Sequence, residues 1–106
     1  MRAYSPHELE ARLGATALQP LLVDVREPWE YEICRLEGSV NVPLAQIPAR
    51  ADELPRDREI VMICHHGMRS YQAGQYLLRA GFAQVVNLDG GIDAWAALVE
   101  RDMPRY

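Results

Sequence analysis

The sequence is poor in cysteine, and this scarcity bears on where the protein works. Its 106 residues include only two cysteines, too few to indicate the disulfide framework of a small secreted domain. The first residues also lack the apolar core of a signal peptide. We therefore expect a reducing, cytoplasmic compartment.

Long apolar runs and blocks of one charge are missing as well. No apolar stretch approaches the roughly 20 residues that a membrane helix needs. The formal net charge is −4, and arginine and lysine do not cluster, so there is no electrostatic case for nucleic acid binding. No internal repeat or linker divides the chain. We expect one domain over residues 1–106 that binds neither membranes nor nucleic acids.

Helical and strand patterns alternate along the chain. Helical patterns are present at residues 5–14, 27–31, 44–54, 70–80 and 92–99. Short apolar runs typical of buried strands are present at residues 21–25, 59–63 and 85–88, and residues 38–43 suggest a brief strand ended by Pro43. Alternation of this kind predicts an α/β fold with a small, mainly parallel sheet.

Chemically distinctive residues follow three of these predicted strands. Asp24 and Arg26 come at the end of the first strand, residues 64–69 after the third, and residues 89–91 after the last. Parallel sheets bind ligands beyond the carboxyl ends of their strands. We therefore expect these segments to meet at one edge of the sheet and to form one site.

Cys64 is the candidate nucleophile of that site. It leaves a buried strand and enters a loop that contains Gly67 and leads into a helix. The loop N–H groups, the positive end of the helix dipole and Arg69 should favour the thiolate over the thiol. Gly67 permits a positive φ or a close backbone approach. The alternative is a buried structural cysteine, a common fate of a free thiol.

Four ordered segments resemble the rhodanese family of sulfurtransferases. They read Leu-Val-Asp-Val-Arg-Glu at 22–27, Gly-Ser-Val-Asn-Val-Pro at 38–43, Cys-x-x-Gly-x-Arg-Ser at 64–70 and Leu-x-Gly-Gly-x-x-Ala-Trp at 88–95. The resemblance is strongest over residues 21–95, and it implies a rhodanese-like domain with helices on both faces of its sheet. One departure is Cys34-Arg35, where family members often carry Gly-His; this weakens any role for that histidine.

The resemblance implies sulfur transfer in two steps. Cys64 would take sulfane sulfur from thiosulfate or a persulfide donor and then pass it to a thiophilic acceptor. The partners would be small sulfur anions, or a protein that donates or accepts sulfur. Because the persulfide of Cys64 is itself the carrier, neither a metal nor an organic cofactor is expected.

The rest of the loop is expected to bind the substrate. These residues are His65, His66, Gly67, Met68, Arg69 and Ser70. Arg69 would hold the oxygens of an anionic donor, or it could pair with a carboxylate, for which Asp24 is the obvious candidate. Adjacent residues rarely converge on one metal ion, so His65 and His66 are expected at the rim of the pocket. Their charge would vary near neutral pH, and Met68 would add apolar rim or face solvent.

Other residues have structural interpretations that compete with functional ones. Asp24 and Arg26 are expected to form an ion pair that braces the loop. Cys34 could resolve an oxidised Cys64 as a disulfide, although an ordinary half-buried thiol is the simpler interpretation. Trp29 could line the site or pack in the fold, whereas Trp95 is expected in the core.

Two alternative functions remain open. Phosphatases and arsenate reductases also use a cysteine–arginine loop, but with five intervening residues, whereas four residues separate Cys64 from Arg69. The shorter loop should make a smaller cradle, better suited to a sulfur atom than to phosphate. The other alternative is an interaction module or persulfide carrier without free turnover, in which Trp29, Tyr31 and the two histidines would contact a partner.

Overall fold

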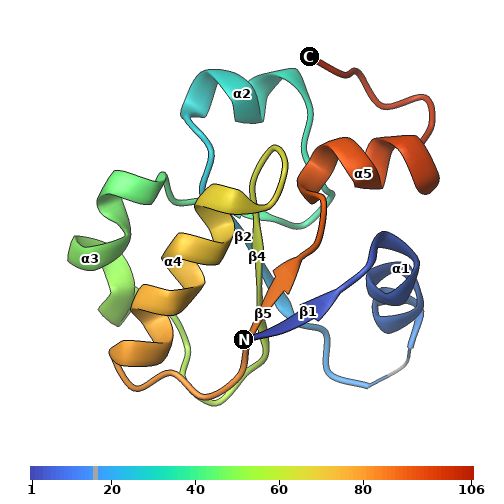
Figure 1. Ribbon diagram of the computed structural model, residues 1–106. Coiled ribbons are helices and arrows are strands. Elements are labelled where there is room, and N and C mark those ends of the chain that lie inside the picture. The colour runs from blue at the N-terminus through green and yellow to red at the C-terminus, as the bar shows by residue number, and fades with distance from the viewer. Residues whose placement is uncertain (16) are drawn as a thin grey trace.

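A parallel β-sheet forms the centre of the molecule (Figure 1). The structure is a computed structural model that describes residues 1–15 and 17–106. Its described strands are β1 (Arg2–Tyr4), β2 (Leu21–Asp24), β3 (Val40–Asn41), β4 (Ile60–Ile63) and β5 (Val85–Leu88). They lie in the order β1-β5-β4-β2-β3, and every neighbouring pair is parallel. The predicted sheet is confirmed, and the edge strand β1 is added to it.

The helices include those that the sequence pattern predicts. They are α1 (Pro6–Gly14), α2 (Pro28–Ile33), α3 (Ile47–Arg50), α4 (Met68–Arg79) and α5 (Gly91–Leu98). Ser5 and Glu8 cap α1 reciprocally, as expected. The pattern over residues 44–54 becomes α3 between two short 3₁₀ turns, Leu44–Gln46 and Ala51–Glu53. None of the described helices is long and apolar enough to cross a membrane.

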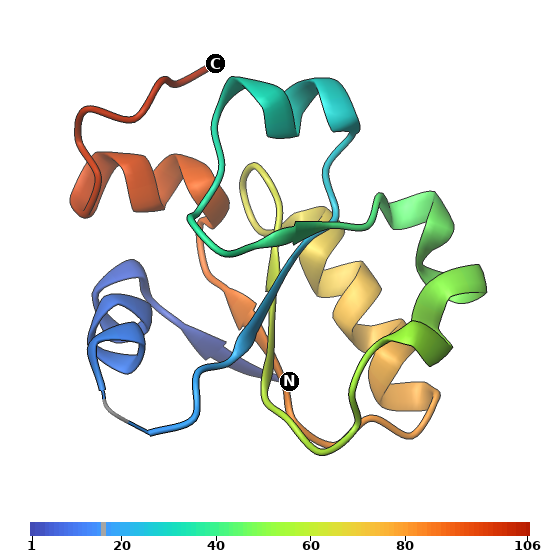
Figure 2. The same ribbon diagram turned by 180° about the vertical axis from the view of Figure 1, so that it is seen from behind.

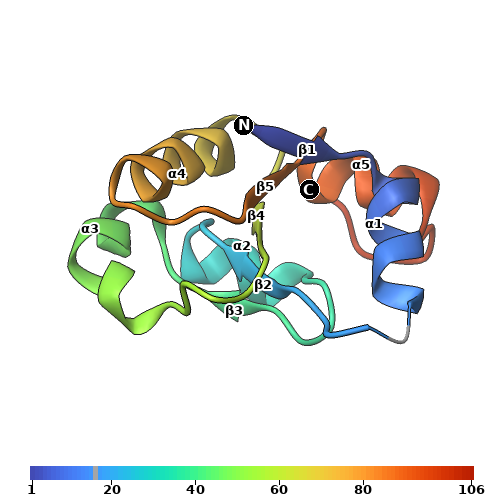
Figure 3. The ribbon, with the colours of Figure 1, turned by 90° about the horizontal axis from the view of Figure 1, so that it is seen from below.

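The two faces of the sheet are covered by different helices (Figure 3). Successive strand residues point to opposite faces, so Met62 packs with Leu77 of α4 on one side. The neighbouring Val61 and Ile63 pack with Trp95 of α5 on the other side, in a cluster that α1 also joins. Helices on both faces and a buried Trp95 are therefore confirmed.

Helix α2 lies on neither face. It sits beyond the ends of the strands, beside the final residues of the chain (Figures 1 and 2). The segment that leaves β4 loops out between α2 and α5 before it enters α4 (Figure 1). The fold thus surrounds this loop with α2, α5 and the end of the chain, three elements that are far apart in the sequence.

Candidate functional site

Parallel strands bring the predicted site residues to one edge of the sheet. Asp24 and Ile63 are register partners at the ends of β2 and β4, and Cys64 follows directly. Asp89 and Gly90 leave the adjacent β5 at the same edge. The predicted convergence of these segments is confirmed, and Cys64 lies at its centre with only 1% of its surface exposed.

The sulfur of Cys64 contacts two hydrogen-bond donors from its own loop. The N–H of Gly67 donates to Sγ at 3.0 Å, and the hydroxyl of Ser70 lies 3.2 Å from Sγ. Gly67 has φ +105° and is the N-cap of α4, which begins two residues before the predicted start. The positive φ expected at Gly67 is confirmed. Several loop amides were expected to face the sulfur, whereas among the described residues one amide and one hydroxyl do so.

Asn87 of β5 completes the base of the loop, and sequence reasoning missed it. Its Nδ2 donates to the carbonyl of Gly67 at 3.1 Å, and its Oδ1 lies 2.6 Å from the Ser70 hydroxyl. A hydroxyl carries one proton, so Ser70 can donate to Asn87 or to the sulfur of Cys64 but not to both. Asn87 therefore competes for the proton that would stabilise a thiolate. The available signal was a polar residue inside the apolar run 85–88.

The start of α5 holds the other side of the loop. The N–H groups of Ile92 and Asp93 donate to the carbonyls of Cys64 and His65 at 2.8 and 3.0 Å, which satisfies helix-end donors that would otherwise lack partners. This approach requires glycine at position 91. A Cβ there would lie 2.5 Å from the Cys64 carbonyl oxygen and closer still to that of His65, and φ is +62°. The glycine pair thus seats the backbone of the loop.

Arg69 pairs with Glu30 of α2 rather than with Asp24. Its Nη1 and Nη2 donate to the two carboxylate oxygens of Glu30 at 2.7 and 2.9 Å. The Asp24 partner suggested by the sequence is wrong, because Asp24 is already taken by Arg26. Hydrogen bonding from Arg69 outweighs the effect of burial and lowers the pKa of Glu30 to about 2.

Asp24 and Arg26 form the expected ion pair, and both are fully buried. Arg26 Nε and Nη2 donate to the Asp24 carboxylate at 2.9 and 2.7 Å. Nη2 also donates to the carbonyl of Cys34 at 2.6 Å, and Nη1 to that of Glu30 at 3.3 Å. The pair thus braces α2 and the chain that follows it. The expectation that it braces the Cys64 loop is wrong, because both side chains are occupied by partners outside residues 64–70. Both cysteines have free thiols, and Cys34 is half-buried, as its simpler interpretation expected.

The comparisons with known proteins agree with this geometry. A family model described as the rhodanese-like domain matches residues 5–98. The chain belongs to this family. A sulfurtransferase of Allochromatium vinosum is 46% identical over 88 residues, which cover 83% of this chain and 81% of that protein.

Two further relatives show the range of rhodanese-like proteins. The putative sulfur carrier protein YrkF of Bacillus subtilis is 39% identical over 79 residues, which cover 74% of this chain and 43% of YrkF. The chain therefore matches less than half of that relative. The crystal structure of a rhodanese-related protein from Thermoplasma volcanium is 30% identical, with a TM-score of 0.83 over 98% of this chain and 96% of the other.

The rim of this rhodanese-like site is aromatic. The ring of His65 stacks between those of His66 and Tyr106, with centroids 4.0 Å apart in both pairs. Trp29 meets Tyr106 edge-on at 6.0 Å and is 62% exposed, so it borders the site and is not packed in the core. Burial, and then the charge of His66, lowers the pKa of His65, which favours a neutral imidazole. His65 is half-buried and His66 is exposed, and their place at the rim of a substrate pocket stays a prediction.

Asp93 joins the two histidines in a cluster that could hold a metal. One donor atom from each of the three residues lies within 4.8 Å of the others. However, Arg105 already donates to Asp93 at 2.9 and 3.1 Å. The imidazoles are stacked with their planes 25° apart, so their in-plane lone pairs run nearly side by side and do not converge on one ion. The cluster fits an ion-paired rim better than a chelate.

The remaining loop residues are divided between base and rim. Ser70 is fully buried beneath the sulfur, whereas Met68 is 80% exposed.

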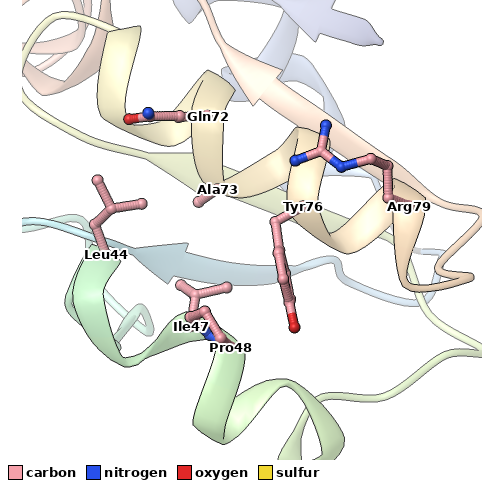
Figure 4. Close-up of a pocket in the computed structure, with 7 residues that line it drawn as sticks. All are labelled: Leu44, Ile47, Pro48, Gln72, Ala73, Tyr76 and Arg79. Carbon is pink, nitrogen blue, oxygen red and sulfur yellow. The ribbon is translucent and has the colours of Figure 1, made fainter.

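A cavity of about 230 Å³ lies between α3 and α4, lined by Leu44, Ile47, Pro48, Gln72, Ala73, Tyr76 and Arg79 (Figure 4). No residue of the 64–70 loop lines this cavity. Substrate binding by the loop stays a prediction.

Proposed function

We propose that this protein is a sulfurtransferase that carries sulfane sulfur on Cys64. The observation that supports this most directly is the arrangement of the thiol: Sγ lies at the end of β4 and accepts an N–H bond from Gly67. Donors that are fixed before reaction can stabilise negative charge on sulfur without rearranging. Membership of the rhodanese-like family and the 46% identical sulfurtransferase add to this support.

The first step loads the sulfur. The thiolate of Cys64 attacks the outer sulfur of thiosulfate, and a new S–S bond forms between protein and donor sulfur. The S–S bond of thiosulfate breaks, and sulfite leaves with its electron pair. A persulfide donor would react in the same way and release a thiolate. The product in either case is a Cys64 persulfide, a covalent intermediate that divides one transfer into two displacements.

The second step unloads it. An acceptor nucleophile such as cyanide attacks the outer sulfur of the persulfide, and the Cys64 thiolate leaves with the electron pair of the broken bond. Gly67 N–H and the Ser70 hydroxyl, which are within hydrogen-bonding distance of Sγ, would stabilise this leaving thiolate. The cycle needs no metal, redox partner or organic cofactor.

Arg69 would attract and orient the anionic donor. A guanidinium has five N–H donors in a planar fork, and Glu30 occupies one on each of the terminal nitrogens. The Arg69 side chain is 35% exposed, so its other donors are available to the oxygens of a sulfur anion. Glu30 in this scheme positions the guanidinium and does not contact the donor.

A persulfide carrier is the second candidate function. It uses the same loading step but delivers the sulfur to a protein without rapid release to small acceptors. The observation that favours it is the likeness to a relative named as a putative sulfur carrier. A phosphatase is disfavoured because only four residues separate Cys64 from Arg69, and we expect no phosphatase turnover from the unmodified chain.

The decisive experiment measures the intact mass of the reduced protein after incubation with thiosulfate. Cys34→Ser should gain one sulfur, about 32 Da, and lose it again on addition of cyanide. Cys64→Ser should gain nothing. If neither variant gains mass with thiosulfate or with a polysulfide while both stay folded and reduced, the proposed function is wrong. Loading that cyanide cannot reverse would favour the carrier over the enzyme.

A further inference from the structure

Residues 101–106, here called the end segment, cross from α5 to α2 beside the Cys64 loop (Figures 1 and 2). Three of its residues anchor this segment. Met103 is buried in the core cluster that contains Trp95, and Arg105 is ion-paired to Asp93 of α5. Tyr106 then reaches α2. The segment therefore spans the site from one bordering helix to the other.

The hydroxyl of Tyr106 is bound on both sides. It donates to Glu30 Oε2 at 2.7 Å and accepts from Arg26 Nη1 at 3.0 Å. The same carboxylate of Glu30 holds Arg69. Tyr106 thus shares its anchor with the cation expected to bind the donor, which places the tyrosine within the site and not merely near it.

The aromatic ring of Tyr106 contacts two other rings beside the Cys64 loop. It lies flat against His65, with the ring planes 10° apart, and His65 is the residue directly after Cys64. The ring also meets Trp29 edge-on, with centroids 6.0 Å apart. Trp29, His65 and Tyr106 thus form an aromatic wall beside the loop of Cys64, whose thiol is almost completely buried. A wall in this position can restrict which groups approach a sulfur on Cys64.

Fewer buried contacts hold the aromatic wall in place than hold the Cys64 loop. Tyr106 is 38% exposed and depends on side-chain contacts, whereas buried backbone bonds from α5 seat the Cys64 loop. Exposed contacts with few buried neighbours open first. Displacement of Tyr106, with Met103 left in the core, is therefore the opening of the site that disturbs the fold least.

We propose that Tyr106 is a specificity-determining residue, whose docked side chain admits small sulfur acceptors to Cys64 and restricts bulky thiols. The acceptor part of this inference rests on the proposed function. Small anions and cyanide pass with the end segment in place. A large thiol, or a cysteine on a protein surface, reacts only after it displaces Tyr106. The same device limits loss of persulfide sulfur to the bulk thiol pool.

The test compares how fast Cys64 reacts with a small and a bulky alkylating reagent. All proteins carry Cys34→Ser, so that Cys64 is the one remaining thiol. The reagents are iodoacetamide and a fluorescein maleimide, and the quantity of interest is the ratio of bulky to small rate constants. Tyr106→Ala removes the wall, and Tyr106→Phe removes only its two hydrogen bonds. The matched control is Tyr71→Ala, since Tyr71 is an exposed tyrosine whose hydroxyl accepts from Gln75.

We expect the rate ratio to rise about tenfold in Tyr106→Ala, the size of discrimination that one steric element commonly provides, and by less in Tyr106→Phe. A rise in either variant that is absent from Tyr71→Ala supports the proposal, so Tyr106→Phe alone decides if the alanine variant does not fold. A ratio unchanged in the folded Tyr106 variants overturns it. An equal rise in Tyr71→Ala also overturns it, because general loosening would then be the cause.

A second readout uses the persulfide and separates this proposal from the proposed function. In Tyr106→Ala the kcat/KM for glutathione should rise relative to that for cyanide. If no persulfide forms but the alkylation ratio rises, the proposed sulfur transfer is wrong and the proposed role of Tyr106 stands. If the persulfide forms but neither the alkylation ratio nor the ratio of kcat/KM for glutathione to that for cyanide changes, only the proposed role of Tyr106 is wrong.

Discussion

The base and the roof of the site are built in different ways. The base consists of Cys64, Gly67, Ser70, Asn87 and Gly91, which come from the loop after β4, from β5 and from the starts of α4 and α5. Its side-chain hydrogen bonds are buried, and backbone-to-backbone bonds from α5 also hold it. The roof consists of Trp29, Glu30, His65, Arg69 and Tyr106. Side-chain contacts hold it together, and several of its members are half-exposed.

The rigid base and the more exposed roof suit two different requirements, fixed donors around the thiol and access for substrates. A nucleophile needs donors whose positions do not change during reaction, and a buried backbone framework provides them. Substrates must also enter and leave, so some of the enclosure has to yield. Side chains that meet at the surface from α2, α4 and the end segment can yield without disturbing the sheet. We therefore expect damage to the base to cost more stability and activity than damage to the roof.

Gly91→Ala should give the largest effect. Its Cβ would collide with the carbonyls of Cys64 and His65, which are backbone atoms, and φ is +62°. Both the collision and the left-handed backbone are unfavourable for alanine. We expect a loss of at least about 3 kcal/mol in the free energy of unfolding, together with loss of sulfur loading, measured by denaturant titration and intact mass.

Gly14→Ala is the matched control for this change. Gly14 ends α1, and a Cβ there would have nothing within 4 Å. Alanine is the better helix former, so this variant should be as stable as the parent or more stable by about 0.5–1 kcal/mol. A Gly91→Ala protein with the same stability and loading as Gly14→Ala would contradict the rigid base.

Asn87→Ala should have the next largest effect. It removes the donor to the Gly67 carbonyl and the acceptor of the Ser70 hydroxyl, and it leaves two buried polar groups with one partner fewer. The expected cost is about 2–3 kcal/mol of stability. Ser70 is then free to donate to Sγ, so the thiolate fraction of Cys64 should increase, measured as absorbance near 240 nm, a typical thiolate band, against pH.

The control for Asn87→Ala is Ser70→Ala in the same background. If Ser70 mediates the effect, the alanine change at position 87 should no longer alter the titration of Cys64 once the hydroxyl is absent. An unchanged shift in the double variant would mean that Asn87 acts on the thiol by another route.

The sequence predicted the base far better than the roof, for a physical reason. A backbone that approaches another backbone closely requires glycine, and a buried strand requires an apolar run. Both requirements restrict the residue types at neighbouring positions, so they can be recognised in the sequence. Cys64, Gly67 and the glycine pair at 90–91 could thus be identified in advance. Asn87 was missed because it stands inside an apolar run, where packing is the usual role.

The sequence named His65, Arg69 and Trp29 but not the contacts that join the roof, because no local pattern links residues that are distant in sequence. Glu30 lies 39 positions from Arg69 and 76 from Tyr106, and nothing near Arg69 shows which carboxylate it will meet. The nearer candidate in the motif, Asp24, was taken by Arg26 instead. Strand β1 was missed for a similar reason: its three residues, Arg-Ala-Tyr, are no apolar run, and pairing with β5 defines them as a strand.

Glu30→Gln should give the smallest of these effects and a characteristic dependence on pH. The amide keeps the shape of the side chain but loses the charge that pairs with Arg69, so we expect a loss of about 1–2 kcal/mol at pH 7. The pKa of Glu30 is lowered to about 2 from a reference value of 4.5. A lowered pKa contributes stability that is fully present above the unfolded-state value and is lost as pH falls toward the folded-state value. The difference between parent and variant should therefore be constant above about pH 5.5 and should shrink between pH 4.5 and 2, as measured by urea titrations across this range. A difference that persists undiminished at pH 2 would mean that the loss in Glu30→Gln does not come from the charge of the carboxylate, and the ion pair with Arg69 would then not be what holds the roof.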